Sequence, residues 1–146
     1  MRNMRLSWRL FVTRAYLDMV ADLFHVGHLR LIKRAKQKCD HLIVGIHSDE
    51  DVERYKRKPI ISHEQRCEIV ESCKYVDEVI PNAPLVIDNR YLEENNIDIV
   101  FHGDDITEEL LRQHAALSSR GMVEYLPRTK NISTTEIINR VKNLGD

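Results

Sequence analysis

The sequence predicts an α/β fold in which five parallel strands form one doubly wound sheet with helices on both faces. The first supporting observation is that short apolar runs alternate with segments of helical spacing along the chain. The second is the run at 41–46, whose lack of polar alternation is typical of a strand covered on both faces. The third is the length of 146 residues, which suits one domain with one core.

The first predicted elements lie between residues 11 and 62. An apolar run at 11–17 predicts the first strand. A helix is expected over 27–38 because its apolar residues fall on one helical face, and the second strand follows at 41–46. The polar segment 48–59 predicts a short helix and a loop. Ser62 then starts a Ser-x-x-Gln capping box, which predicts the beginning of another helix.

The third strand is expected at 76–80, where an apolar run ends at Pro81. A short helix at 90–95 and a fourth strand at 98–102 follow. The order of these elements continues the alternation of strand and helix, which requires parallel strands and crossover connections.

The last elements complete the pattern. A helix is expected over 107–120, and Gly121 suits the left-handed residue that often follows a helix. A fifth strand is expected at 122–126, and a capping box beginning at Ser133 predicts the last helix. This Rossmann-like arrangement binds ligands at the carboxyl ends of its strands, so polar residues there are the candidates for function.

Composition excludes several classes of protein. Lys and Arg number 22 against 23 Asp and Glu, and this balance argues against a general nucleic-acid surface. No apolar run approaches the roughly 20 residues that cross a bilayer. The three cysteines form no Cys-x-x-Cys pair, so neither a disulfide framework nor a zinc site is indicated. We therefore expect a cytoplasmic protein with reduced thiols.

The first 13 residues form a basic N-terminal arm. Arg2, Arg5 and Arg9 lie there, and no acidic residue precedes Asp18. We expect a short solvated arm before a single catalytic domain at 14–146. An organelle transit peptide, which is also rich in arginine and poor in acids, is the alternative.

Two histidines stand between the first strand and the first helix, in His25-Val26-Gly27-His28. Imidazoles three residues apart at a helix start face the same side, and Gly27 lets a ligand approach the backbone. The helix amides add an anion site, so this segment suits phosphate binding. A metal site completed by Asp22, or unrelated polar residues, are the alternatives.

Two further polar segments follow strands. Residues 55–58 are Tyr-Lys-Arg-Lys, and residues 128–135 place two cations before a run of hydroxyls that opens a helix. The alternatives are a solvated loop for the first segment and a plain helix cap for the second. A second helix start with an arginine is what a polyphosphate needs. Without a Gly-rich Walker motif, these residues indicate a transferase or hydrolase acting at a nucleotide phosphate.

These segments resemble known motifs. His25-Val26-Gly27-His28 resembles the His-x-Gly-His motif of the nucleotidyltransferase superfamily, and residues 128–135 resemble the Arg-Thr-x-Gly-Ile-Ser-Thr-Thr motif of its cytidylyltransferase branch. Residues 43–50, 75–84 and 102–105 are also similar to that branch. The likeness covers roughly residues 14–142 and is closest to the ethanolamine-phosphate and choline-phosphate cytidylyltransferases.

The resemblance implies that CTP, with Mg²⁺ as its cofactor, reacts with a small phosphate monoester or phosphonate to give a cytidylyl-linked product and pyrophosphate. It implies catalytic roles for His25, His28, Lys56 and Arg128, and no metal ligand from the protein. The nucleotide-binding residues that it implies are Val20, Ala21, His25, Gly27, His28, His102, Asp104, Arg128, Thr129, Ile132, Ser133, Thr134 and Thr135.

The sequence departs from the family pattern in two places. Where the branch usually has Gly-x-Phe-Asp, this chain has Met19-Val20-Ala21-Asp22. We therefore expect the turn after the first strand to form without the freedom of a glycine at Met19, and an aromatic contact to be lost at Ala21. Asn131 replaces a glycine in the second motif, where asparagine tolerates the left-handed conformation.

The resemblance also implies that Asp18, Lys56 and Arg66 contact the acceptor. Asp18 matches an acidic residue that faces a cationic head group; a role in the strand-end turn is the alternative. Leu85 stands where choline enzymes place a tryptophan, so we expect a primary amine, in phosphoethanolamine or an aminoalkylphosphonate. The alternatives are glycerol 3-phosphate or phosphocholine as acceptor, an adenylyltransferase that uses ATP, and a non-catalytic nucleotide-binding module.

The remaining histidines divide into two groups. His47 and His102 follow predicted strands and are candidates to line the site, whereas His41, His63 and His114 are expected to be exposed. Members of the branch are commonly homodimers, so we expect a homodimer. The choline enzymes carry a long amphipathic segment after the catalytic domain; none follows the last predicted helix here, so we expect no membrane partner.

Overall fold

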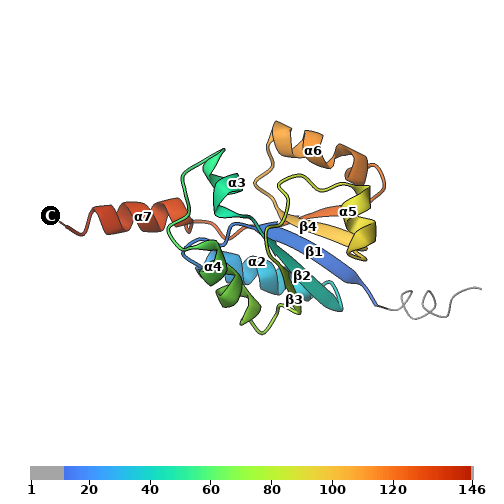
Figure 1. Cartoon of the computed structure of the whole chain (residues 1–146), viewed down its shortest axis with the longest axis horizontal. Helices are drawn as coiled ribbons and strands as arrows, with labels where there is room; N and C mark the ends of the chain where they lie inside the picture. The colour runs from blue at the N-terminus through green and yellow to red at the C-terminus, as the bar shows by residue number, and fades with distance from the viewer. Residues whose placement is uncertain (1–11, 146) are drawn as a thin grey trace, which may run out of the picture.

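The computed structural model describes residues 12–145, and the predicted basic arm therefore lies almost wholly outside the described residues (Figure 1). Its sheet confirms the predicted fold class. Five strands lie in the order β3-β2-β1-β4-β5, and every neighbouring pair is parallel. β1 is central, because β2 pairs with one of its edges and β4 with the other.

The strands and helices alternate as the sequence predicts. In chain order the elements are β1 (Arg14–Met19), α2 (Val26–Lys36), β2 (His41–Ile46), α3 (Asp49–Glu53), α4 (His63–Glu71), β3 (Glu78–Ile80), α5 (Asn89–Glu94), β4 (Ile99–Gly103), α6 (Glu108–Ser118), β5 (Val123–Leu126) and α7 (Thr134–Lys142). The first strand lies later than the predicted 11–17, because β1 pairs along its whole length with β2, from Arg14 opposite His41 to Met19 opposite Ile46. The pairing partner, and not the local apolar run, decides where β1 ends.

Two apolar layers enclose the sheet, where the sequence indicated one core. Leu17 on β1 packs in a cluster that includes Ile32 of α2 and Val70 of α4. Tyr16, which points to the opposite face, packs in a second cluster with residues of α5 and α6. Side chains that alternate along a strand therefore fill both layers, as a doubly wound sheet requires.

The strand order places the reversal of chain direction beside β1. The chain moves from β1 outward through β2 to β3, then returns to β4 on the other side of β1. The carboxyl ends of β1, β2 and β4 consequently meet at one edge, with connections leaving toward opposite faces. This edge is where the predicted functional residues gather.

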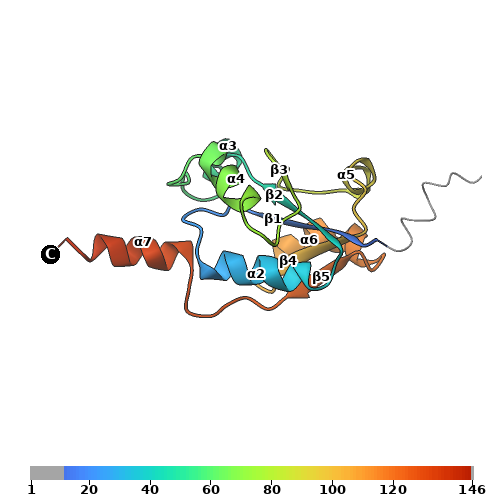
Figure 2. The same ribbon diagram turned by 90° about the horizontal axis from the view of Figure 1, so that it is seen from below.

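Helix α7 projects from the body of the molecule (Figures 1 and 2). None of its residues is buried, and Val141 on it is 61% exposed. Gly121 has φ +66°, which confirms it as the left-handed residue after α6. Between residues 12 and 145, no helix is both long enough and apolar enough to cross a membrane.

Candidate active site

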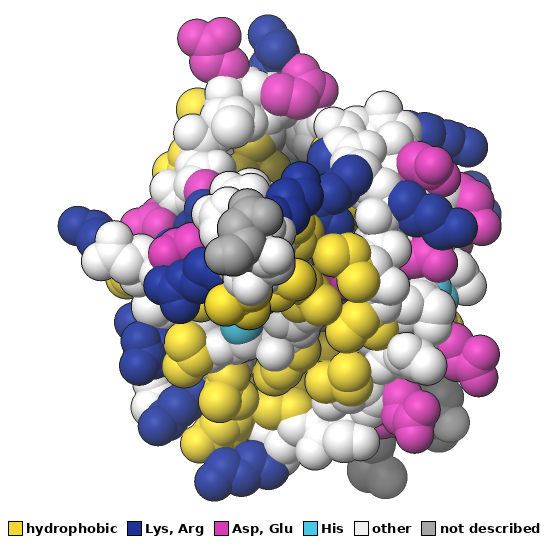
Figure 3. All heavy atoms as spheres, turned by 90° about the vertical axis from the view of Figure 1, so that its left-hand side faces the viewer, with side chains coloured by type: hydrophobic (Ala, Val, Ile, Leu, Met, Phe, Trp, Pro, Cys, Tyr) yellow, Lys and Arg dark blue, Asp and Glu magenta, His cyan; other side chains and the backbone are white. Residues whose placement is uncertain are grey.

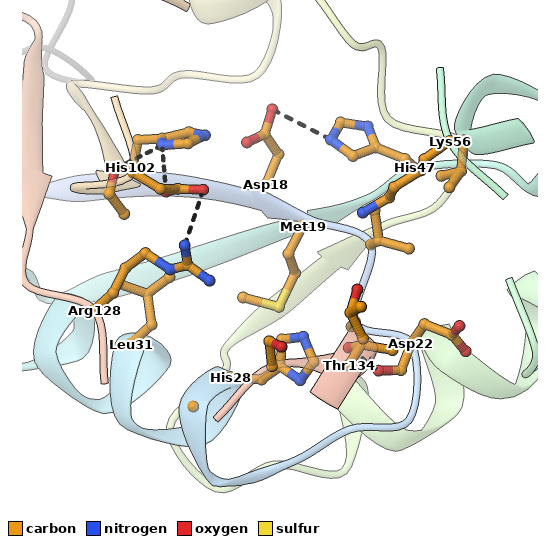
Figure 4. A pocket seen from close by; sticks show the side chains of 18 of the residues that line it. Asp18, Met19, Asp22, His28, Leu31, His47, Lys56, His102, Arg128 and Thr134 are labelled. Atoms are coloured by element: carbon orange, nitrogen blue, oxygen red, sulfur yellow. Dashed lines mark hydrogen bonds and ion pairs between the residues drawn. The ribbon is translucent and has the colours of Figure 1, made fainter. Parts of the chain in front are cut away.

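A cavity of about 830 Å³ opens at the carboxyl edge of the sheet (Figure 4). It is lined from β1, β2 and β4, from the starts of α2 and α7, and from α6 and the loop after α3. Most residues predicted for the site line it: Asp18, Val20, Ala21, His25, Gly27, His28, Lys56, His102, Arg128, Thr129, Ile132, Ser133, Thr134 and Thr135. Two that do not are Asp104 and Arg66.

The two histidines of the first motif cap α2 and fix each other. Nδ1 of His25 accepts the backbone N–H of Gly27 (3.0 Å), and Nδ1 of His28 accepts the backbone N–H of His25 (3.1 Å). The ring centroids lie 3.9 Å apart. This is a capping box in which imidazoles replace the usual hydroxyl and carboxamide, so both rings are held by bonds within four residues.

These bonds decide which nitrogen carries the proton. An Nδ1 that accepts an N–H is unprotonated, so the neutral ring carries its hydrogen on Nε2. Burial, the neighbouring His25 and nearby cations lower the pKa of His28 to about 4. Burial and Arg128 also lower the pKa of His25. Near neutral pH both rings are therefore uncharged hydrogen-bond donors through Nε2–H, which suits phosphate oxygens.

Gly27 has a role beyond the predicted approach of a ligand. A Cβ at this position would lie 2.8 Å from the ring of His25 and 3.2 Å from Cγ2 of Ile132. The second contact joins the first motif to the last one, which lies more than a hundred residues away in the chain. The glycine thus lets the two helix starts close on one another.

The start of α7 forms the second wall. Ser133 caps the helix by accepting the N–H of Glu136 (3.1 Å), and Thr134 Oγ1 donates to the carbonyl of Asp22 (2.9 Å). Asn131 has φ +64°, so it takes the left-handed conformation that the replaced glycine suggested. Thr129 Oγ1 is buried, lines the cavity and has no partner in the described chain, which leaves it available to a ligand.

Asp22 anchors the loop that carries Lys56. Its side chain is 3% exposed and accepts the backbone N–H groups of Ile60 and Ile61, both at 2.9 Å, together with Arg57 (3.1 Å). Burial alone would raise the pKa of Asp22, but these hydrogen bonds lower it. Since all these bonds hold residues just after Lys56, Asp22 fixes the position of that cation. From sequence, Asp22 is a candidate only as a ligand in the alternative metal site.

Lys56 lines the cavity between the starts of α2 and α7 at one end and Asp18 and His47 at the other (Figure 4). Its Nζ lies 5.5 Å from the centroid of the Tyr55 ring. Burial and the neighbouring Arg57 lower the pKa of Lys56. An ammonium in this place can contact phosphate groups lying on either side of it.

Arg66 does not touch the cavity, which corrects the predicted contact with the acceptor. Its side chain is fully buried. The guanidinium donates to the carbonyls of Ile61 (3.0 Å) and Val20 (2.5 Å) and pairs with Asp49 (2.7 Å). These partners engage all three of its nitrogens inside the protein, so Arg66 holds the turn after β1 and does not reach the cavity.

Asp104 does not line the cavity either. Its carboxylate accepts the backbone N–H of Arg128 (3.0 Å), which fixes the start of the second motif. The neighbouring Asp105 lines the cavity instead, with its carboxylate 3.4 Å from the guanidinium of Arg128. A direct contact of the Asp104 side chain with the nucleoside does not fit this geometry. Sequence alone does not distinguish two adjacent aspartates after a strand.

The other end of the cavity carries Asp18, His47, His102 and His114. His47 Nε2 lies 3.6 Å from Asp18 Oδ2 (Figure 4). His114 was predicted to be exposed, but it is 6% exposed and bonds through Nδ1 to the hydroxyl of Tyr125 (3.2 Å). The helical spacing from His114 to the buried Leu117 was the signal that places it on the inner face of α6.

The other two histidines predicted to be exposed are partly buried. His41 pairs with Glu78 at 3.1 Å on the edge of the sheet. Nε2 of His63 accepts the backbone N–H of Asn82 (3.1 Å). Neither lines the cavity, so both serve local structure.

Comparison with known proteins agrees with this geometry. A family model for cytidylyltransferase-like proteins matches residues 19–140, which is most of the chain. The chain belongs to the cytidylyltransferase-like family.

Several curated proteins are similar to this cytidylyltransferase-like chain. A probable ethanolamine-phosphate cytidylyltransferase of Schizosaccharomyces pombe is 38% identical over 88% of this chain and 36% of that protein. The ethanolamine-phosphate cytidylyltransferase of Mus musculus is 33% identical over 89% of the chain and 33% of that protein. Choline-phosphate cytidylyltransferase A of Rattus norvegicus is 38% identical over 88% and 36%. The chain thus spans about a third of the length of these relatives.

Solved structures share the fold. A lipopolysaccharide core biosynthesis protein of Thermoplasma volcanium superposes with a TM-score of 0.66 at 21% identity, covering 84% of this chain and 99% of that one. A pantothenate synthetase of Thermus thermophilus gives a TM-score of 0.61 at 14% identity, covering 94% of this chain and 68% of that one. At these identities the likeness concerns the fold alone.

In this cytidylyltransferase-like chain the turn after β1 takes its positive φ angles after Met19 and not at it. Met19, which replaces the family's glycine, is simply the last residue of β1. The positive φ angles fall at Ala21 (+58°) and Leu23 (+50°). Non-glycine residues in this region cost roughly 1–2 kcal/mol each. The turn holds this conformation because Arg66 and Thr134 bond to its carbonyls on both sides of Ala21.

Proposed function

We propose that residues 14–146 form a catalytic unit that transfers the cytidylyl group of CTP to a small phosphate monoester or phosphonate and releases pyrophosphate. One observation carries the proposal. The starts of α2 and α7 face the same cavity, where two neutral histidines and Lys56 present hydrogen-bond donors. Family membership over residues 19–140 supports the use of CTP.

The proposed reaction is one displacement at phosphorus. An oxygen of the acceptor phosphate attacks the α-phosphorus of CTP in line, a new P–O bond forms, and the bond to the β-phosphate breaks. The acceptor oxygen already carries negative charge, so no base is needed. His25 and His28 donate through Nε2–H to the triphosphate, and Lys56 contacts both phosphate groups. Catalysis then rests on positioning and on stabilisation of the developing charge.

The second motif completes the proposed triphosphate site. The N–H groups of the first turn of α7, the unpartnered Thr129 Oγ1 and the hydroxyl of Thr135 face the cavity beside Arg128. A helix N-terminus with hydroxyls and an arginine suits the β- and γ-phosphates.

Magnesium remains part of the proposal. Among residues 12–145, no group of three or more His, Cys, Asp or Glu side chains is placed to hold a metal ion. Nucleotide-bound Mg²⁺ uses phosphate oxygens and waters with one or two carboxylates at most, and the cavity fits such a complex. When bound, the ion neutralises charge on the leaving pyrophosphate.

Asp18 supports a cationic acceptor. Its carboxylate lines the cavity away from the two helix starts (Figure 4). A carboxylate repels phosphates and attracts an ammonium group. We therefore propose phosphoethanolamine or an aminoalkylphosphonate as the acceptor. The names of the most similar relatives support phosphoethanolamine, and phosphocholine is the second candidate that they support.

Pyrophosphate release tests this function. The chain is assayed with CTP or ATP against phosphoethanolamine, phosphocholine, glycerol 3-phosphate, 2-aminoethylphosphonate and 2-hydroxyethylphosphonate. We expect CTP with an amine-bearing acceptor to give the highest kcat/KM. Preferred use of ATP would establish an adenylyltransferase, and tight CTP binding without turnover would establish a nucleotide-binding module.

We also propose a homodimer and a cytoplasmic location. Figure 3 shows hydrophobic side chains gathered on the face from which α7 projects, and α7 buries none of its own residues. Such a face favours contact with a second copy. Cys39, Cys67 and Cys73 are free thiols, which suits a reducing compartment. Light scattering after size-exclusion chromatography tests the dimer, and a monomeric mass at assay concentrations would contradict it.

A further inference from the structure

The end of the cavity that carries Asp18 contains a second hydrogen-bond acceptor. His47, the residue after β2, is 7% exposed and lines the cavity. Its Nδ1 lies 3.0 Å from the carbonyl oxygen of Ala83. A carbonyl oxygen only accepts hydrogen bonds, so Nδ1 of His47 carries a proton. In the neutral ring the lone pair is therefore on Nε2.

The lone pair of His47 faces the carboxylate of Asp18. Nε2 lies 3.6 Å from Asp18 Oδ2, which is longer than a hydrogen bond between an imidazolium and a carboxylate. With the ring neutral, Nε2 of His47 and the carboxylate of Asp18 are two acceptors side by side, and no hydrogen bond joins them. A ligand with at least two N–H groups on one nitrogen satisfies both.

We propose that His47 acts with Asp18 as the specificity-determining pair of the acceptor site and selects a protonated primary amine over a quaternary ammonium. This inference rests on the proposed function, because it concerns the head group of the acceptor. A primary ammonium donates one N–H to Asp18 and another to His47. A quaternary ammonium has no N–H, so it leaves the buried lone pair of His47 without a partner.

The side chains around this pair do not offer a quaternary ammonium the aromatic contacts that would replace the missing hydrogen bonds. Such a group needs open aromatic faces. Tyr55 lines this part of the cavity, but Lys56 lies over its ring. The hydroxyl of Tyr16 is buried under the sheet and lies 3.3 Å from that of Tyr91. Leu85 offers an aliphatic wall, which suits the methylene groups of a short chain.

A series of acceptors with increasing N-methylation tests the pair. We measure kcat/KM for phosphoethanolamine, its N-methyl and N,N-dimethyl derivatives and phosphocholine, each with saturating CTP. The number of N–H donors on these ammonium groups falls from three to none. We expect the largest fall in kcat/KM, about tenfold, between the N-methyl and the N,N-dimethyl derivative, because that step leaves fewer than two N–H donors. Tenfold is the scale of one lost hydrogen bond in a buried site.

Two variants separate specificity from structure. Asn at this position keeps a donor near Nδ1 for Ala83 but lacks an acceptor at Nε2. His47→Asn should therefore lower kcat/KM for phosphoethanolamine about tenfold and leave kcat/KM for phosphocholine unchanged. Gln places its amide near Nε2, so His47→Gln should retain part of the preference. His41→Asn is the matched control, because His41 begins the strand that His47 follows and lies outside the cavity. KM for CTP should stay constant in all three.

The outcomes distinguish this inference from the proposed function. Equal kcat/KM for phosphoethanolamine and phosphocholine in the unaltered chain, or an equal loss for both in His47→Asn, would overturn the inference while leaving cytidylyl transfer intact. If none of the acceptors supports turnover of CTP, the proposed function fails. Calorimetric titration with phosphoethanolamine and phosphocholine then decides the inference: selective binding that His47→Asn abolishes supports it, and equal or absent binding overturns it.

Discussion

The two ends of the cavity are built in different ways. At the phosphate end, His25 and His28 are fixed by hydrogen bonds within four residues, and Ser133 caps its own helix. At the amine end, Asp18 lies on β1 and His47 directly follows the neighbouring strand β2, so the two meet only across the sheet. The phosphate end presents donors and cations, whereas the amine end presents acceptors. One substrate with an anionic and a cationic end can therefore bind in one orientation only.

Two aspartates of one short segment serve the two ends. Asp18 faces the cavity from β1, while Asp22, four residues later, is buried under the loop that carries Lys56. The first carboxylate is available to a ligand and the second is saturated by protein donors. The same side chain is thus open to a ligand in one place and holds a loop in the other, and only its surroundings distinguish the two.

The largest effect is expected at the phosphate end. Lys56→Ala or His28→Ala should lower kcat/KM by ~10²-fold or more with every acceptor, because each removes a group that stabilises transition-state charge. Pyrophosphate release measures it. Lys58→Ala is the matched control, since Lys58 is exposed and does not line the cavity. A fall of less than about threefold would remove the altered residue from the mechanism.

A smaller effect is expected at Asp22. Asp22→Asn replaces one acceptor oxygen by a donor, so the loop at 57–61 should loosen and kcat/KM should fall about tenfold through misplacement of Lys56. Hydrogen exchange of the Ile60 and Ile61 amides should rise in the same variant. Glu93→Gln, on the exposed surface of α5, is the control. Loss of activity without faster exchange would point to a direct role for Asp22.

The last prediction concerns the stability of the fold against pH and not its activity. The pKa of His28 is about 4 in the folded protein, against an ordinary value of 6.5. Between these values the unfolded chain takes up a proton that the folded chain does not, so the free energy of unfolding should fall as the pH falls from 6.5 to 4. The contribution of His28 is on the order of 3 kcal/mol, and it is present in full above pH 6.5.

Urea unfolding at pH 7, 6 and 5 measures this dependence. His28→Asn keeps an acceptor for the N–H of His25 but does not titrate, so it should flatten the fall. The lowered pKa values of His25 and His114 act in the same direction, so part of the slope should remain. An identical slope in the variant would contradict the assigned protonation of His28.

The phosphate end could be predicted from sequence because its geometry is local. Helical spacing after Gly27 and the capping box at Ser133 place the segments at 25–28 and 128–135 at helix starts from sequence alone. The β/α alternation then brought both to one edge of the sheet. The left-handed conformation of Asn131 was also a local property and is confirmed.

The amine end and the supporting contacts depended on tertiary structure. Arg66 is buried and bonded within the protein, and the exposed Asp104 bonds to the backbone of Arg128, so neither side chain lines the cavity. His114 is turned inward by the packing of α6, and Ala21 carries strain that neighbouring elements impose. Sequence determined which elements form and which helix starts are candidates to bind anions, because those depend on neighbours within a turn. Which polar side chains face the ligand depends on what each strand and helix packs against, and the tertiary structure alone decides that.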